Sequence, residues 1–518
     1  MASTSIFVRK SVADAEREVS HAGGLRRTLG KWHLTALGVG ATIGAGIFAT
    51  TGTAIVGDAA RPGAGPAIVF SFLLTAIACG FAALCYAEFA AMVPIAGSAY
   101  TYAYTSIGEF VAWIIGWDLI VEYAVGNIGV AIGWSGHFRE LMTHFGVHIP
   151  PWLTTDYRSA HDAFVAAGAG ATDAGTQALA LAWSNAPHLG SLPVIFNLPA
   201  FAVVALITVI LVIGIKESAN SNNAMVILKI GIIIFFLCVG AFLIRPENYN
   251  NPATGGFAPN GFKGVSAAAA IIFFSYIGFD AVSTAAEEAE NPARDMPFGI
   301  IMSLIICTVL YILLSIVMTG IAPWQQLGTP EPMITALQFA QGPPKLLTFS
   351  RFIIALGAVA AMGSVLLVFQ LGQPRIFYSM SRDGLLPKAF SKVHPKYRTP
   401  YVGTILTGLF VATFAAFANI AEVVDLTNIG TLFAFVLVSA GVIFLRRTEP
   451  DRPRPFRVPG VPYTPIISIL ACFYLMVQLP AVTWIRFGIW LAVGLVFYFL
   501  YGYKHSVLRH GGSRPPAL

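Results

Sequence analysis

The chain has 518 residues, of which 56% are hydrophobic and only 11% are charged. Soluble domains carry roughly 25% charged residues, so this composition excludes an ordinary soluble protein and indicates a polytopic membrane protein. The net charge of +6 comes from basic residues in short loops, and we therefore expect no nucleic-acid partner. The five cysteines lie in apolar segments without disulfide or zinc spacing, which predicts packing residues and no bound metal.

The apolar segments are long and end at clusters of glycine, proline and charge, which favours helices of about 20 residues over barrel strands of about 10. We predict an all-α membrane protein with twelve spans. They are residues 33–57, 66–92, 109–136, 194–214, 222–244, 264–287, 298–322, 351–380, 401–420, 427–446, 463–480 and 484–503. Residues 1–31 have no apolar core and predict a tail rather than a signal peptide.

The Lys and Arg residues predict the orientation of these spans. Twelve is even, so both termini lie on one side of the membrane. If that side is the cytoplasm, 22 of the 31 basic residues lie in cytoplasmic segments and 8 in outer ones, as the positive-inside rule describes. We therefore expect a multi-pass cell (inner) membrane protein with cytoplasmic tails at 1–31 and 504–518 and a cytoplasmic linker at 447–462.

The first predicted span is interrupted by small residues in the run Thr42, Ile43, Gly44, Ala45 and Gly46. A helix that restarts here would leave backbone N–H groups free, and such a helix start binds anions without a charged side chain. The carboxylate of an amino acid fits that description. Close packing of two helices through small residues explains the same run equally well.

Span three carries two carboxyl groups, Asp118 and Glu122, which share one face of the helix because they are one turn apart. With Asp280 in span six they make three acidic residues within spans. Acidic residues in membrane helices are candidates for proton relays. The alternative is structural pairing with Lys229 or with backbone donors.

A long outer loop, 137–193, follows span three and is rich in Ala, Gly, Thr and Pro. Its stretch 166–174 predicts a flexible segment. The loop is either an uncommitted linker or a lid or partner surface.

Lys229 lies five residues inside span five. A buried ammonium needs partners and exchanges protons more readily than an exposed one, so Lys229 is a candidate fixed cation that replaces a coupling sodium ion. The alternative is that its side chain extends to the membrane interface.

Span six is the second interrupted span, and it contains Phe273, Phe274, Ser275, Ile277 and Asp280 around a glycine. Unwound carbonyl groups here can accept hydrogen bonds from an ammonium group. The offset from span one is five helices, and an odd offset reverses orientation, which favours inverted repeats of spans 1–5 and 6–10. The two interruptions occur at equivalent positions of these repeats, and we therefore treat both as candidate parts of one site.

Four stretches resemble the amino acid–polyamine–organocation superfamily and, within it, the twelve-span bacterial form of the cationic amino acid transporter family. They are residues 38–48, 273–284, 287–297 and 374–387. The resemblance covers nearly the whole chain. It implies a ten-helix transport core at 32–446, with repeats at about 33–244 and 264–446, discontinuous helices 1 and 6, and two appended helices at 463–503.

The resemblance also implies roles for individual residues. The substrate carboxylate meets the backbone at Ile43–Gly46, and its ammonium meets the carbonyl groups of Thr42, Phe274, Ser275 and Ile277. Phe369 lies near the pocket for the substrate side chain. Lys229, Glu122 and Asp280 match positions that support proton coupling.

The expected function is proton-coupled uptake of small neutral or cationic L-amino acids by alternating access, with the proton as coupling ion and no cofactor. A sodium symporter or an exchanger of the same fold is the first alternative, and a membrane nutrient sensor is the second. No nucleophile–base pair, metal cluster or phosphate loop occurs in the sequence, so we expect no enzyme.

Overall fold

The computed structural model describes residues 6–10, 28–58, 60–93, 98–170, 174–190, 192–214 and 219–510. Within these residues the fold is helical, apart from one hairpin of two-residue strands, β1 (His188–Leu189) and β2 (Leu192–Pro193). The predicted tails at 1–31 and 504–518 fall partly outside the described residues.

Nine segments of the described residues are helical, long and apolar enough to cross a membrane. They contain α2 (Lys31–Thr42) with α3 (Thr51–Val56), α4 (Ile68–Met92), α6 (Glu109–Ile120) with α7 (Gly126–His144), α11 (Ala219–Ala241), α12 (Gly261–Ile272), α13 (Pro292–Ile321), α15 (Pro344–Arg382), α17 (Ile420–Thr448) and α19 (Ala481–Phe497). The chain is therefore a multi-pass membrane protein.

Three shorter apolar helices join these nine segments: α10 (Leu198–Ile213), α16 (Tyr401–Phe417) and α18 (Tyr463–Val477). Each coincides with a predicted span. The predicted ends were less accurate than the helices themselves. For example, the span predicted at 351–380 is the longer α15, which begins just after Pro343 and continues through Pro374.

The two interruptions predicted from the sequence are present. Helix α2 ends at Thr42, and Ile43 is extended, with φ −76° and ψ 97°; a π-helical turn, η1 (Gly46–Thr50), then leads into α3. Helix α12 ends at Ile272 and is followed by a short 3-10 turn, η7 (Phe273–Ser275). The chain turns at Gly278 and continues as the 3-10 segment η8 (Phe279–Glu288).

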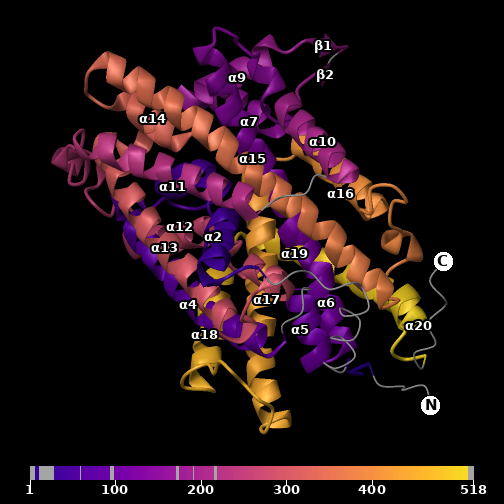
Figure 1. Cartoon of the computed structure of the whole chain (residues 1–518). Helices are drawn as coiled ribbons and strands as arrows, with labels where there is room; N and C mark the ends of the chain where they lie inside the picture. The colour runs from indigo at the N-terminus through magenta and orange to yellow at the C-terminus, as the bar shows by residue number, and fades with distance from the viewer. Residues whose placement is uncertain are drawn as a thin grey trace.

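Both interrupted spans lie at the centre of the bundle (Figure 1). Helix α2 packs against α11, α13 and α15, and α12 packs against α4. The apolar stretch of the second interrupted span is entirely buried and that of the first is 89% buried, whereas that of α19 is only 22% buried. The interruptions therefore face other protein segments rather than the surroundings of the bundle.

The long outer loop predicted at 137–193 is largely helical in its described part. Helix α7 extends to His144, and α8 (Tyr157–Gly168) and α9 (Ala174–Asn185) pack on each other. Asp156 caps α8 by accepting a hydrogen bond from the N–H of Ser159 at 2.8 Å. Arg158 pairs with Glu422 of α17, which fixes the insertion to the bundle. Residues 171–173 lie outside the described residues.

The two interruptions cross in direct backbone contact. A Cβ atom placed on Gly46 would lie 2.3 Å from the Cα atom of Ser275 and 2.6 Å from its backbone nitrogen. At the second crossing, Gly278 has φ +120°, a conformation that favours glycine. A Cβ atom there would lie 2.8 Å from the carbonyl carbon of Ala41. Only glycine allows these approaches, so the two broken spans are held against each other.

We expect Gly46→Ala to destabilise the fold, because the new methyl group meets backbone that no side-chain rotation can move away. A clash of this kind costs about 1–3 kcal/mol, which thermal unfolding of purified protein in detergent would report as a lower Tm. Gly80→Ala in α4 is the matched control, since its Cβ would have no neighbour within 4 Å. That control should be neutral or stabilising by about 0.5–1 kcal/mol; equal stability of the two variants would contradict the crossing.

Candidate functional site

The end of α2 is capped by side chains from two neighbouring helices. The last carbonyl groups of a helix have no donor within the helix. Lys229 of α11 donates from Nζ to the Gly40 carbonyl at 2.5 Å, and the hydroxyl of Tyr311 in α13 donates to the Thr42 carbonyl at 3.1 Å. The carbonyl groups freed by the interruption thus bind side-chain donors in the bundle interior.

Lys229 is fully buried, with 0% of its surface exposed. Its side chain points toward α2, so the alternative that it extends to the membrane interface is wrong. A buried ammonium is costly unless it is hydrogen-bonded, and the Gly40 carbonyl supplies one such bond. The position ties the charge of Lys229 directly to the broken end of α2.

The end of α12 is capped in the same manner. Asn428 of α17 donates to the carbonyl groups of Ala270 at 2.7 Å and Ile271 at 3.2 Å, and Thr75 of α4 donates to that of Ala269 at 3.0 Å. Sequence reasoning missed Tyr311, Thr75 and Asn428. A polar residue inside an apolar span was the available signal, but it does not indicate which carbonyl group the residue reaches.

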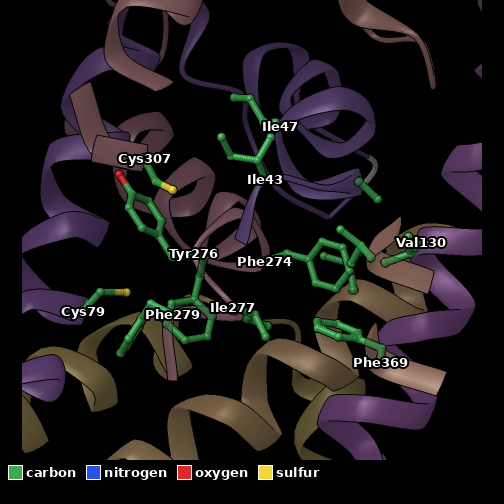
Figure 2. Packing of buried hydrophobic residues seen from close by; sticks show 14 of the residues in the cluster. Ile43, Ile47, Cys79, Val130, Phe274, Tyr276, Ile277, Phe279, Cys307 and Phe369 are labelled. Atoms are coloured by element: carbon green, nitrogen blue, oxygen red, sulfur yellow. The ribbon is translucent and has the colours of Figure 1, made fainter. Parts of the chain in front are cut away.

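Apolar side chains surround one side of the crossing, where Figure 2 shows Phe274 close to Val130 and Phe369. Two glycines of α7 make room for these rings. A Cβ on Gly129 would lie 3.3 Å from Phe274, and one on Gly126 would lie 3.6 Å from Phe369. Phe274 and Phe369 therefore form one wall against α7.

Phe273 does not share this wall. Its ring packs against Phe435 of α17 with 5.7 Å between ring centroids. On the side of the crossing opposite Phe274, Tyr276 lies against Tyr311 and packs with the core. Of the two predicted phenylalanines at this interruption, Phe274 lies on the side of Phe369 in Figure 2, and Phe273 packs on α17.

Glu122 and Asp280 lie side by side in the bundle interior. Glu122 is in a π-helical turn, η3 (Val121–Val125), and Asp280 is in η8. The Oδ1 atom of Asp280 accepts a hydrogen bond from the Gly278 N–H at 3.3 Å. The two carboxyl groups lie within hydrogen-bond reach of each other, and Glu122 also lies beside the Thr431 hydroxyl. The structure thus brings together two of the predicted coupling residues.

Asp118 lies one helical turn before Glu122, and both of its carboxyl oxygens are buried without a hydrogen-bond partner in the described part of the chain. It packs against α17, where a Cβ atom on Gly430 would lie 2.9 Å from Asp118 Oδ1. Across the described ranges, no group of three His, Cys, Asp or Glu residues has an arrangement that could hold a metal ion.

Ion pairs connect the helices at one end of the bundle. Arg61, which follows α3, binds Asp425 of α17 at 2.7 Å and Asp58 at 2.6 Å. Arg139 of α7 binds Glu331, which precedes helix α14 (Pro332–Phe339), at 3.1 Å. At the opposite end, the chain before α2 pairs with the end of η8, since the Leu29 N–H donates to the Glu288 carbonyl at 2.9 Å. The first interrupted span is therefore bound to other segments at both of its ends, by ion pairs after α3 and by a backbone hydrogen bond before α2.

Comparison with known proteins agrees with this architecture. A family model described as amino acid permease matches residues 29–500. The branched-chain amino acid permease BcaP of Bacillus subtilis is 46% identical over 506 residues, which cover 98% of this chain and 99% of the relative. The methylthioribose transporter of the same organism is 43% identical over 98% of this chain and 100% of its own length.

A plant relative, the vacuolar cationic amino acid transporter 2 of Arabidopsis thaliana, is 37% identical over 87% of this chain and 64% of its own length. These relatives are named as permeases or transporters and not as enzymes. The predicted superfamily is thereby confirmed. The chain belongs to the amino acid permease family of membrane transporters.

Proposed function

We propose that this protein is a secondary active transporter that takes up small neutral or cationic L-amino acids together with protons. The observation that carries the proposal is the contact between the two interrupted spans at Gly46 and Ser275. Helix starts bind anions and helix ends bind cations. In this proposal one amino acid binds the helix start of one interrupted span and the helix end of the other.

We infer that the nine long segments and the three shorter apolar helices all cross the membrane, which gives twelve spans with both termini in the cytoplasm. In this arrangement α2 with α3 forms span one, and α12 with η8 forms span six. Spans one to five and six to ten then form two inverted repeats, with α18 and α19 appended. The distribution of Lys and Arg over the loops supports the orientation.

In this proposal the substrate carboxylate binds backbone N–H groups within Gly44–Gly46, where the chain restarts as η1, because the N–H of Ile43 already donates to the Val39 carbonyl at 2.9 Å. The ammonium group binds carbonyl oxygens of Phe274, Ser275 and Ile277, in the segment where α-helical hydrogen bonding is interrupted. The Thr42 carbonyl can join them, because a carbonyl oxygen has two lone pairs and Tyr311 uses one. The substrate side chain then extends toward the wall of Phe274 and Phe369.

The relatives are named for branched-chain amino acids, methylthioribose and cationic amino acids. The first and third names support an amino acid as substrate here. Since the three differ in side chain while the crossing is built mainly from backbone, we infer that the crossing recognises the α-carboxylate and the α-ammonium. The surrounding wall then sets the side-chain preference.

The proton site in this proposal is the pair Glu122 and Asp280. Two adjacent carboxylates in an apolar interior cannot both be ionised without a large cost, so such a pair holds a proton. Lys229 is the second group in this proposal whose charge changes when a proton binds or leaves. Its bond to the Gly40 carbonyl links that response to the position of α2.

Alternating access requires that the contacts at each end of the bundle open in turn. The pairs Arg61–Asp425 and Arg139–Glu331 would open on the outer side. On the cytoplasmic side the pairing of Leu29 with Glu288 connects the two interrupted spans to each other. We therefore expect α2 and η8 to move together.

We expect Lys229→Met to weaken the pH dependence of uptake, because methionine keeps the length of the side chain but cannot donate to the Gly40 carbonyl or carry a proton. Uptake of radiolabelled amino acid into proteoliposomes would be measured over a range of pH. Lys263→Met, at an exposed position near the start of α12, is the control and should behave like the wild type. A pH profile of Lys229→Met that matches the wild type would argue against a coupling role.

We expect an inward proton gradient to drive uptake of labelled amino acids into liposomes that contain the purified wild type. A panel of alanine, leucine and arginine, with and without sodium, separates the alternatives. Stimulation by sodium without a response to the pH gradient would identify a sodium symporter. Uptake that needs only amino acid on the opposite side would identify an exchanger, and no uptake of any of them would refute the transport proposal.

A further inference from the structure

Asn428 caps the broken end of α12 from inside the bundle. It lies in α17, has 0% of its surface exposed, and donates its two amide hydrogen bonds to Ala270 and Ile271. Turning the amide over would aim its oxygen at these two carbonyl oxygens, so the donor orientation is required chemically. These carbonyl groups belong to the last turn of α12, where the helix itself supplies no donors.

Lys229 occupies the corresponding position at the other interruption. It caps the Gly40 carbonyl, three residues before Ile43, as Asn428 caps Ala270, three residues before Phe273. In the proposed arrangement, α11 and α17 are spans five and ten, which a five-span repeat makes equivalent.

A second pair of donors follows the same relation between spans, although its two acceptors, Thr42 and Ala269, lie at different distances from the breaks. Thr75 caps α12 from α4, and Tyr311 caps α2 from α13. In the proposed arrangement these helices are spans two and seven. Two independent pairs of caps therefore follow one repeat symmetry.

The two caps differ in chemistry. An amide keeps both of its N–H donors at any physiological pH, whereas a buried lysine can lose a proton. The cap on α2 can therefore respond to protons, and the cap on α12 cannot. Of the two equivalent helix ends, the end of α2 has a cap whose charge can change, and the end of α12 has a cap whose charge cannot.

We propose that Asn428 is a positioning residue for the substrate ammonium and the non-titrating counterpart of Lys229. It fixes the end of α12, so that the carbonyl groups just beyond, at Phe274 and Ser275, keep their direction when the coupling groups change charge. This inference rests on the proposed function, because it assumes that these carbonyl groups bind the substrate.

Titratable groups lie close to this stretch of α17. Glu122 faces it from η3, beside the buried hydroxyl of Thr431, and Asp118 faces it from α6, beside Gly430. Asp280 of η8 lies next to Glu122. The wild type thus has its own pH dependence near Asn428, and each variant must be compared with the wild type at the same pH.

The test is Asn428→Asp. An ionised aspartate cannot donate and faces two carbonyl oxygens, whereas its protonated form regains one O–H donor. Labelled amino acid would be exchanged against unlabelled amino acid at equal pH on both sides of proteoliposomes, so that KM does not depend on a proton gradient. We expect a KM about tenfold above wild type at alkaline pH, where the buried aspartate ionises, as the loss of buried hydrogen bonds implies, and a ratio to wild type that falls toward one as the pH is lowered.

Asn127→Asp in α7 is the matched control, because Asn127 is 1% exposed and donates to the side-chain oxygen of Gln370 at 2.7 Å. Gln370 can turn its amide and donate to an aspartate, so this variant should show no recovery in acid. Equal ratios for Asn428→Asp at alkaline and acidic pH, or the same recovery in the control, would overturn the inference.

If Asn428→Asp does not fold, Asn428→Ser and Asn428→Ala decide the question. Serine keeps one donor, so its KM should lie below that of alanine, and equal values would overturn the positioning role. Failure of the proposed function is a separate observation. It would appear in the wild type as an absence of amino acid exchange and of gradient-driven uptake, whatever the variants do.

Discussion

Unpaired backbone groups in an apolar interior are the constraint on which this structure depends. A continuous helix satisfies its own N–H and C=O groups, and a broken one does not. This protein breaks two central spans, at Ile43 and after Ile272. Each break must therefore be surrounded by protein, which explains why the two interrupted spans are among the most buried in the bundle.

The neighbouring helices satisfy the freed carbonyl groups with side chains that each come from a different span: Lys229, Tyr311, Thr75 and Asn428. The two breaks must also approach each other closely, and Gly46 and Gly278 allow this because they have no side chain. What remains is a short stretch of polar backbone, bordered by the apolar wall of Phe274 and Phe369. Such a surface suits a small zwitterion in our proposal, because the backbone contacts the charged groups that amino acids share.

The carboxyl groups form a separate buried centre. Glu122 and Asp280 face each other, and Asp280 is bound to the N–H of Gly278, the glycine that packs on Ala41. The proposed proton site, Glu122 and Asp280, therefore lies next to the place where the two interrupted spans cross. The proximity gives a physical route by which a proton and a substrate can affect the same backbone, without a long chain of intermediates.

The sequence by itself determined the membrane class, the helical fold and the location of both interruptions, because apolar length and glycine or acid within a span are local properties. Only the tertiary structure decided that Lys229 reaches α2, that Glu122 meets Asp280, that Phe273 faces α17 rather than Phe369, and that much of the described part of 137–193 is helical. These are contacts between distant segments, and Asn428 was missed for the same reason: an asparagine in an apolar run does not reveal which helix end lies opposite.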